Sequence, residues 1–263
     1  MKLKKSLGQN LLIDKNIIKK IISNVQNTNS YNFFEIGPGT GNLTEELINK
    51  RPKSLVLIEK DKKFAGYLKN KFIKKKNIKV YNEDILDLDI ESLIKPNSVV
   101  FGNLPYNISS QILMKFLKFS KWPPNFEKII FMFQKEVGDK ILADHKSKNY
   151  GRISIIRNWR MDVTNSFFVS KNCFYPKPKV DSMILVLKPK EIKKITIKNM
   201  ENLEKITQIL FSRKRKMINK AFKLIFSDYI KTAKELKIDL NIRPNQLTCN
   251  DFYKITQLFE KQN

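Results

Sequence analysis

Short apolar runs alternate with amphipathic stretches through the first half of the chain. Strands are predicted where the runs are continuous, at residues 31–37, 54–59, 78–84, 98–102 and 128–134. Helical periodicity marks the segments between them, most clearly at residues 14–25, 40–50, 61–75 and 109–119. Strands that alternate with helices of about ten residues are typical of βαβ units on a mostly parallel sheet. The pattern therefore predicts an α/β fold of the Rossmann-like type.

The pattern changes in the second half of the chain. Residues 152–163 fit either a helix or a strand, and residues 181–187 read as a strand at an antiparallel edge. From Glu201 onward the periodicity is helical, with no convincing strand. We predict a catalytic domain spanning residues 1–190 and a small all-α domain spanning residues 195–263.

The net charge of the chain indicates what kind of molecule it binds. The chain has 51 Lys and Arg against 25 Asp and Glu, a formal net charge of +26. Such an excess calls for a polyanion, either nucleic acid or an anionic membrane surface. Nucleic acid is the stronger candidate, because the sequence shows no membrane span, lipidation signal or amphipathic anchor.

Cysteine and histidine are scarce, with two and one residues respectively. Neither a disulfide framework nor a cysteine-based zinc site is expected, and we expect no metal. Together with the lack of a signal peptide in "MKLKKSLGQNLLIDKN", this favours a cytoplasmic protein.

A glycine-rich turn follows the first predicted α/β strand, in "EIGPGTGNLTEEL". Its glycines are Gly37, Gly39 and Gly41, and Asn42 stands where a dinucleotide fingerprint would have its third glycine, which disfavours a nicotinamide enzyme. The acid before the turn, Glu35, would repel a pyrophosphate but tolerates a cationic ligand.

Two more acids end the next strands. Glu59 is placed to accept both hydroxyls of a ribose, and Asp84 to accept a hydrogen bond from an adenine amine. Singly, each acid is as readily explained as a cap or a solvated group. The ordered set of three carboxylates predicts a class I methyltransferase site for S-adenosylmethionine, whose sulfonium is positive and which carries no phosphate.

The sequence Asn103-Leu104-Pro105-Tyr106 ends the fourth strand and resembles the motif of amino-group methyltransferases. The Asn103 side-chain oxygen and the Leu104 carbonyl can accept hydrogen bonds from an exocyclic amine and stabilise the charge that grows during attack. Pro105 fixes the turn, and Tyr106 offers a face on which a base stacks. The plainer interpretation is a turn with a buried tyrosine, and the upstream cofactor pattern disfavours it.

Over nearly its whole length the chain resembles the small-subunit ribosomal RNA adenine dimethyltransferases of the KsgA type. The resemblance rests on "SLGQNLLID", "FEIGPGTGNLT", "VFGNLPYNIS", "FQKEVGDKILA", "SKNYGRIS", "FYPKPKVDS" and "FSRKRKMINKAF". It implies dimethylation of the N6 amines of two adjacent adenines in a hairpin loop near the 3′ end of small-subunit (16S) rRNA. The implied methyl donor is S-adenosylmethionine, which leaves as S-adenosylhomocysteine. The implied substrate particle is an immature 30S subunit during ribosome biogenesis, and we expect a monomer.

The resemblance also implies site residues. The cofactor contacts carried over by position are Asn10, Leu12, Gly37, Gly39, Glu59, Asp84 and Asn103. Phe174 is implied to close over the target base from the side opposite Tyr106, with hydrophobic packing as its alternative.

A basic stripe is expected on one helix near residues 211–225. Arg213, Lys216, Lys220 and Lys223 form the stripe, opposite an arc that includes Met217 and Phe222. A solvated lysine face is the simpler explanation, but the overall charge favours contact with RNA phosphates.

Three rival functions stay open at this point. A large-subunit rRNA adenine methyltransferase of the macrolide-resistance type shares the fold, cofactor and Asn-x-Pro-Tyr chemistry. A non-catalytic assembly factor would be expected to lose Asn103, Tyr106 or the glycine turn, and the chain keeps all of them. A cytosine-C5 methyltransferase needs a cysteine nucleophile, and Cys173 has no partner motif.

Overall fold

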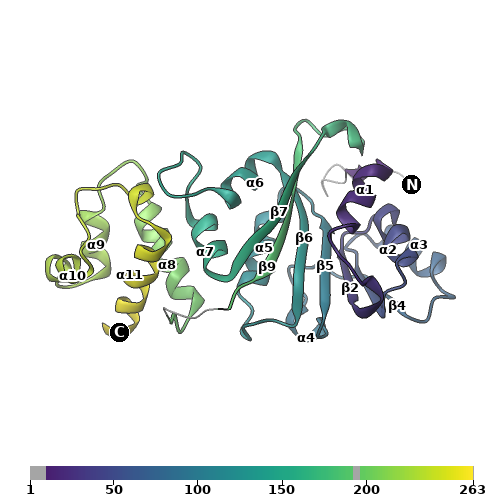
Figure 1. The fold of residues 1–263 in the computed structure, drawn as a ribbon, viewed down its shortest axis with the longest axis horizontal. Coiled ribbons are helices and arrows are strands. Elements are labelled where there is room, and N and C mark those ends of the chain that lie inside the picture. The colour runs from purple at the N-terminus through teal and green to yellow at the C-terminus, as the bar shows by residue number, and fades with distance from the viewer. Residues whose placement is uncertain (1–9, 192–195, 263) are drawn as a thin grey trace. The chain divides into compact units, whose positions relative to one another are not determined.

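Residues 10–191 and 196–262 are described by a computed structural model of the chain (Figure 1). The chain divides into two units. The first joins Met1–Gly138 to Val163–Pro189, and the second joins Asp139–Asp162 to Lys190–Asn263.

This division differs from the predicted boundary, which kept residues 139–162 with the catalytic domain. They belong to the helical unit because α7 (Arg152–Arg160) packs on α8 (Met200–Phe211) and on α11 (Cys249–Gln262). The predicted start at residue 195 lies outside the described residues. The assignment of catalysis to one unit and RNA recognition to the other stays a prediction.

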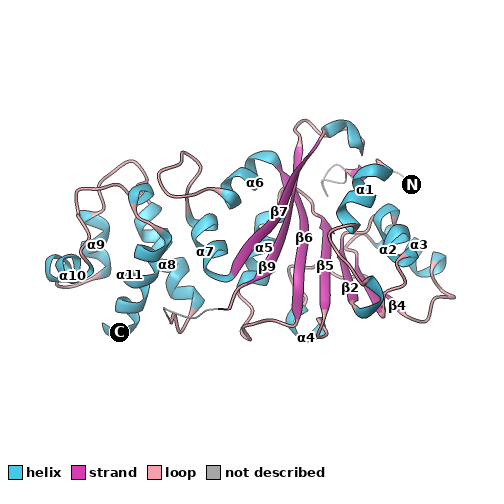
Figure 2. Cartoon of the chain, viewed as in Figure 1, coloured by secondary structure: helices cyan, strands magenta, loops and turns pink. Residues whose placement is uncertain are grey.

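A seven-stranded sheet organises the first unit, with the order β4-β3-β2-β5-β6-β9-β7 (Figure 2). The parallel strands are β2 (Asn32–Ile36), β3 (Ser54–Ile58), β4 (Ile78–Tyr81), β5 (Ser98–Asn103) and β6 (Phe126–Gln134). Strand β9 (Ser182–Pro189) pairs antiparallel with β6, and β7 (Met161–Val169) follows it at the edge. The predicted α/β class and the antiparallel edge are confirmed.

Burial on both faces explains why the central strands are continuous apolar runs. Val99, Val100 and Phe101 of β5 are fully buried, and the Phe101 ring meets Phe33 of β2 edge to face at 5.1 Å.

Four of the helices that alternate with these strands lie at predicted positions, and a one-turn helix at residues 90–93 was not predicted. The four are α1 (Lys15–Ile22), α2 (Asn42–Asn49), α3 (Lys62–Lys71) and α5 (Ser109–Leu117), and the one-turn helix is α4 (Ile90–Leu93). Asp14 caps α1, because its side chain accepts hydrogen bonds from the backbone N–H groups of Asn16 and Ile17. Helix α6 (Lys135–Leu142) follows β6 directly. The ambiguous stretch 152–163 is helical through α7 and ends in the first residues of β7, which begins at Met161.

Aromatic packing holds the second unit together. Phe211 stacks on Phe252 with ring centroids 5.6 Å apart, and Tyr150 meets both rings edge to face. Two further helices, α9 (Asn219–Ile225) and α10 (Tyr229–Leu236), complete the unit. No helix in the described part of the chain has both the length and the apolar character needed to cross a membrane.

The prediction of a single basic helix around residues 211–225 is wrong. Helix α8 ends at Phe211 and α9 begins at Asn219, and turns occupy the residues between them. The backbone N–H groups of Ile218 and Asn219 donate to the carbonyl oxygens of Ile242 and Leu240 at 3.0 and 3.2 Å, so these long-range bonds replace helical ones. The expected apolar arc is divided as well, since Phe222 is buried whereas Met217 is 55% exposed.

Candidate active site

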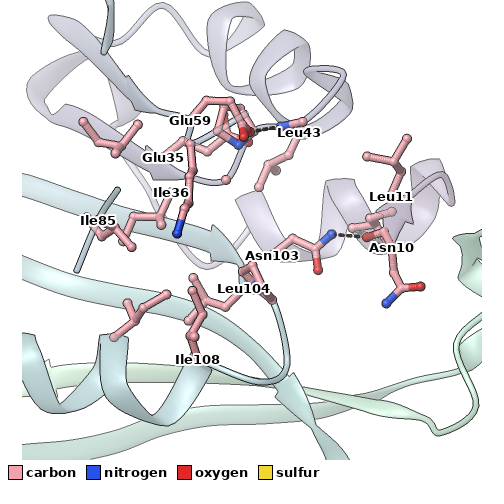
Figure 3. Close-up of a pocket in the computed structure, with 18 of the residues that line it drawn as sticks. Asn10, Leu11, Glu35, Ile36, Leu43, Glu59, Ile85, Asn103, Leu104 and Ile108 are labelled. Atoms are coloured by element: carbon pink, nitrogen blue, oxygen red, sulfur yellow. Dashed lines mark hydrogen bonds between the residues drawn. The ribbon is translucent and has the colours of Figure 1, made fainter. Parts of the chain in front are cut away.

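A cavity of about 1230 Å³, its open mouth included, lies at the carboxyl ends of the parallel strands (Figure 3). All the predicted cofactor contacts line it, namely Asn10, Leu12, Gly37, Gly39, Glu59, Asp84 and Asn103. Leu104, Pro105 and Tyr106 line it too. The structure brings them together because β3 and β5 both pair in parallel with β2, so the three strands end at one edge of the sheet.

The glycine turn requires its glycines. Gly37, Gly39 and Gly41 all have positive φ angles, of 67°, 58° and 87°. A Cβ added to Gly39 would lie 2.8 Å from Cδ2 of Leu11, so the end of that side chain would have to shift. A Cβ on Gly37 would lie 3.8 Å from the backbone oxygen of Asn103. The cofactor turn and the proposed methyl-acceptor motif are therefore neighbours.

Glu59 is buried, at 7% exposure, and supports the glycine turn. Its Oε2 accepts a hydrogen bond from the Gly39 N–H at 3.0 Å, and its Oε1 accepts one from the Asp61 N–H at 2.8 Å. Burial raises the pKa of Glu59, and these backbone donors oppose the rise. Each oxygen of a carboxylate can accept more than one hydrogen bond, so Glu59 keeps capacity for a ligand.

Asp84 lies in the loop after β4 rather than at the strand end, because β4 stops at Tyr81. Its Oδ1 accepts a hydrogen bond from the Leu86 N–H at 3.0 Å, and its Oδ2 pairs with the ammonium of Lys60. Partial burial alone would raise the pKa of Asp84, but these donors outweigh it and the pKa lies below its usual value. Lys60 also lines the cavity, and the sequence analysis missed it.

Glu35 is the third of the predicted acids, and it is not the anion that the sequence led us to expect. It is 2% exposed, and the Thr44 hydroxyl donates to its Oε2 at 2.7 Å. Burial raises the pKa of Glu35 to about 8, against the effect of that hydrogen bond. In the unliganded protein at neutral pH the group is therefore mainly a neutral acid, and a cation beside it would favour its ionised form.

Asn103 has a fixed orientation. Its side-chain Nδ2 donates to the backbone oxygen of Asn10 at 2.8 Å, as the dashed line in Figure 3 shows. A backbone oxygen can only accept, so the amide nitrogen must face Asn10. The Asn103 side-chain oxygen then points away from Asn10, which makes it available as a hydrogen-bond acceptor.

The rest of the motif packs around this amide. Leu104 is buried beneath the turn, where a Cβ on Gly102 would lie only 2.5 Å from its side chain. The Tyr106 hydroxyl and the Ser182 Oγ lie 2.7 Å apart and form a hydrogen bond. Burial raises the pKa of Tyr106. The sequence analysis did not single out Ser182, although it ends the quoted segment "FYPKPKVDS".

Phe174 is not among the residues that line the cavity. It forms the two-residue strand β8 (Phe174–Tyr175), which pairs antiparallel with β1 (Leu11–Leu12) and places Phe174 opposite Leu12. At 3% exposure it belongs to the same core cluster as Leu12. Its role over the target base stays a prediction.

The four basic residues expected to contact RNA lie in the second unit. Arg213 and Lys216 are in the turns after α8, Lys220 and Lys223 are in α9, and all four are exposed. Their role likewise stays a prediction. Among the described residues, no group of three or more His, Cys, Asp or Glu side chains could hold a metal ion.

The chain is similar to known proteins over almost all of its length. The family model "Ribosomal RNA adenine dimethylase" matches residues 1–261. The Ribosomal RNA small subunit methyltransferase A of Pelagibacter ubique is 42% identical, over 99% of this chain and 98% of the relative. That of Mycoplasmopsis synoviae is 40% identical, over 99% and 97%.

Solved structures agree with the fold. A dimethyladenosine transferase from Plasmodium falciparum is 29% identical with a TM-score of 0.76, over 96% of this chain and 98% of that one. The 23S rRNA methyltransferase ErmE shares the fold with a TM-score of 0.68 at 22% identity, over 95% of this chain and 100% of that one. With a family model that spans both units and a cavity that contains the expected residues, the resemblance is confirmed: this chain belongs to the ribosomal RNA adenine dimethylase family.

Proposed function

We propose that the protein transfers methyl groups from S-adenosylmethionine to the N6 amines of two adjacent adenines in small-subunit rRNA. One observation carries the proposal most directly. The Asn103 amide is fixed by Asn10 so that its acceptor oxygen is available in the wall of the cavity that holds the glycine turn. Family membership supports an rRNA adenine dimethyltransferase, and the relatives named above support the small subunit over the large one.

The cavity residues fit this methyl donor. Gly37 and Gly39 let the ligand approach the backbone, Glu59 keeps acceptor capacity for the ribose hydroxyls, and Asp84 is an ionised acceptor for the adenine amine. When bound, the cofactor supplies an electrophilic methyl group on a positive sulfonium. Asn10 and Leu12 would complete the wall around it.

The acceptor side needs groups that orient a weak nucleophile. The Asn103 side-chain oxygen and the Leu104 carbonyl would accept hydrogen bonds from the target amine, and Pro105 holds the turn between them. Tyr106 would stack on the base, which contributes about 1–3 kcal/mol. No strong base is required before attack, because the amine becomes acidic once it has gained a methyl group.

Further parts of the proposal concern regions away from the cavity walls. Phe174 would serve as the second base clamp only if its side chain turned out of the core that it shares with Leu12. Arg213, Lys216, Lys220 and Lys223 would contact phosphates of an immature 30S subunit. We also propose that the protein is a cytoplasmic monomer.

Reversing the charges at Arg213, Lys216 and Lys220 should lower the affinity for the subunit and make that affinity less dependent on salt concentration.

The deciding experiment offers unmethylated small and large subunits to the purified protein with labelled S-adenosylmethionine. We expect incorporation into the small subunit only, as dimethyladenosine by mass spectrometry. Asn103→Ala should abolish transfer while leaving binding to the small subunit largely intact, and Asn49→Ala, an exposed change in α2, should be silent. Incorporation only into the large subunit would contradict the proposal, as would full turnover by Asn103→Ala.

A further inference from the structure

The loop of residues 170–181 connects β7 to β9 and contains β8. In the pairing of β8 with β1, Tyr175 lies directly opposite Leu11, and Leu11 lines the cavity. Directly opposed residues of an antiparallel pair project to the same face. Tyr175 is therefore a neighbour of the cavity wall.

Alternation along β8 gives its two aromatic residues opposite environments. Phe174 is buried in the core, whereas Tyr175 is 65% exposed. Two more apolar side chains in the adjoining segments are open to solvent, Ile13 after β1 at 50% and Val180 of the same loop at 44%. The Tyr175 ring thus contributes little to the core and presents a free aromatic surface.

The loop that carries this ring is basic in sequence. The loop carries Lys171, Lys177 and Lys179, the last two exposed. Its one acid, Asp181, already accepts the Lys171 backbone N–H at 2.9 Å. Proteins bind single-stranded nucleic acid by combining exposed aromatic rings with cationic side chains. The ring stacks on a base, and the cations pair with phosphates.

The loop is also held in place before any ligand arrives. The Cys173 carbonyl accepts the backbone N–H of Ile13 at 2.9 Å, and the Asp181 carbonyl accepts that of Lys135, also at 2.9 Å. Pro176 and Pro178 restrict the backbone between these anchors. Little conformational entropy remains to be lost on binding, which favours a surface prepared for a ligand.

We infer that Tyr175 is a stacking platform for the unpaired nucleotide next to the target adenine, with Lys177 and Lys179 on its phosphates. An adenine that enters the cavity leaves its neighbour without a stacking partner, and the Tyr175 ring replaces the lost surface. The inference rests on the proposed function and extends it to a nucleotide that is not methylated in that turnover.

The test compares steady-state methylation of immature small subunits by the full-length wild type, Tyr175→Ala and Tyr175→Phe. Base stacking on an aromatic ring is worth roughly 5- to 150-fold in affinity. We expect Tyr175→Ala to lower kcat/KM by about 5-fold or more, mainly through KM. Tyr175→Phe should keep nearly full activity, because the ring and not the hydroxyl does the stacking. Tyr67→Ala, a change of a partly exposed tyrosine in α3, is the matched control.

The role of Lys177 and Lys179 is tested by the salt dependence of kcat/KM. Lys177→Ala with Lys179→Ala removes two cations, so the slope of log(kcat/KM) against log salt should become shallower by about 1.4. Lys62→Ala with Lys63→Ala removes two exposed cations from α3 and should leave that slope unchanged.

Calorimetric measurement of S-adenosylmethionine binding distinguishes failure of the proposed methyl transfer from failure of the proposed Tyr175 platform. The cofactor should bind Tyr175→Ala as it binds the wild type. An inactive wild type, or one that binds no cofactor, would overturn the proposed function. An active wild type with Tyr175→Ala as active as Tyr67→Ala would overturn the platform alone.

Discussion

The hydrogen bond between Tyr106 and Ser182 gives the sharpest prediction about the site. Ser182 begins β9 and is fully buried, so its hydroxyl fixes the far end of the ring on which the target base is proposed to stack. Removing either hydroxyl should loosen that ring without removing it. Ser182 is then a positioning residue that acts through Tyr106.

The magnitude follows from the contact. A neutral hydrogen bond contributes about 0.5–1.5 kcal/mol, and a buried hydroxyl left without its partner costs about 1–3 kcal/mol. If half of the 1–3 kcal/mol appears in the transition state, Ser182→Ala should slow methyl transfer by about 2- to 13-fold. Tyr106→Phe should have a similar effect, and the double variant should be no slower than either single one. Tyr106→Ala removes the ring and should be far slower.

Single-turnover methylation of small subunits at saturating cofactor measures this step. Ser98→Ala is the matched control, since Ser98 also begins a strand, is 2% exposed and donates its hydroxyl to a backbone oxygen at 2.6 Å. It should lower thermal stability comparably without slowing transfer. If Ser182→Ala slows transfer no more than Ser98→Ala, or if the two single effects simply add, the positioning role is refuted.

Three other measurements probe the cavity. Gly39→Ala should lower the melting temperature by several degrees and weaken cofactor binding, because its φ of +58° and the 2.8 Å contact of an added Cβ both oppose a side chain. Gly66→Ala, at a helical site with nothing within 4 Å, should be neutral or stabilising, and equal losses for both would contradict this. The pKa of Glu35, raised to about 8 from 4.5, predicts that the free energy of unfolding declines as pH rises from 4.5 to 8, by up to about 1.4 kcal/mol per pH unit. Denaturation of Glu35→Gln across this range should show a flatter profile, and parallel profiles would exclude the buried acid as the cause. Lys60→Met should raise the pKa of Asp84, because it removes the ammonium that stabilises the carboxylate. Calorimetry should then show that acidification weakens cofactor binding at a higher pH than in the wild type. An unshifted pH profile would count against the ion pair.

Local signals were sufficient for much of the fold and for the cavity walls. The apolar runs identified β2, β3 and β5, and parallel pairing then placed the acids and amides that follow them at one edge. The glycine turn was readable because positive φ angles select for glycine.

What the sequence did not show depends on contacts between distant residues. Ser182 reaches Tyr106 across 76 positions, and Lys60 reaches Asp84 across 24. The break before α9 arises from bonds to Ile242 and Leu240, which no local periodicity contains. Phe174 is buried because β8 pairs with β1, a strand of two residues that the apolar pattern is too short to reveal.

The hydrogen bond from Asn103 to Asn10 decides which of two orientations the Asn103 side-chain amide adopts. A carboxamide turned by half a revolution keeps its shape but exchanges an acceptor for a donor, and a donor facing an amine repels it. The Asn10 carbonyl, 93 positions earlier in the chain, makes one of these two arrangements much the better. Shortening the chain past that carbonyl would therefore leave the Asn103 amide in the reversed orientation, with its nitrogen facing the proposed target amine, in a fraction of the molecules.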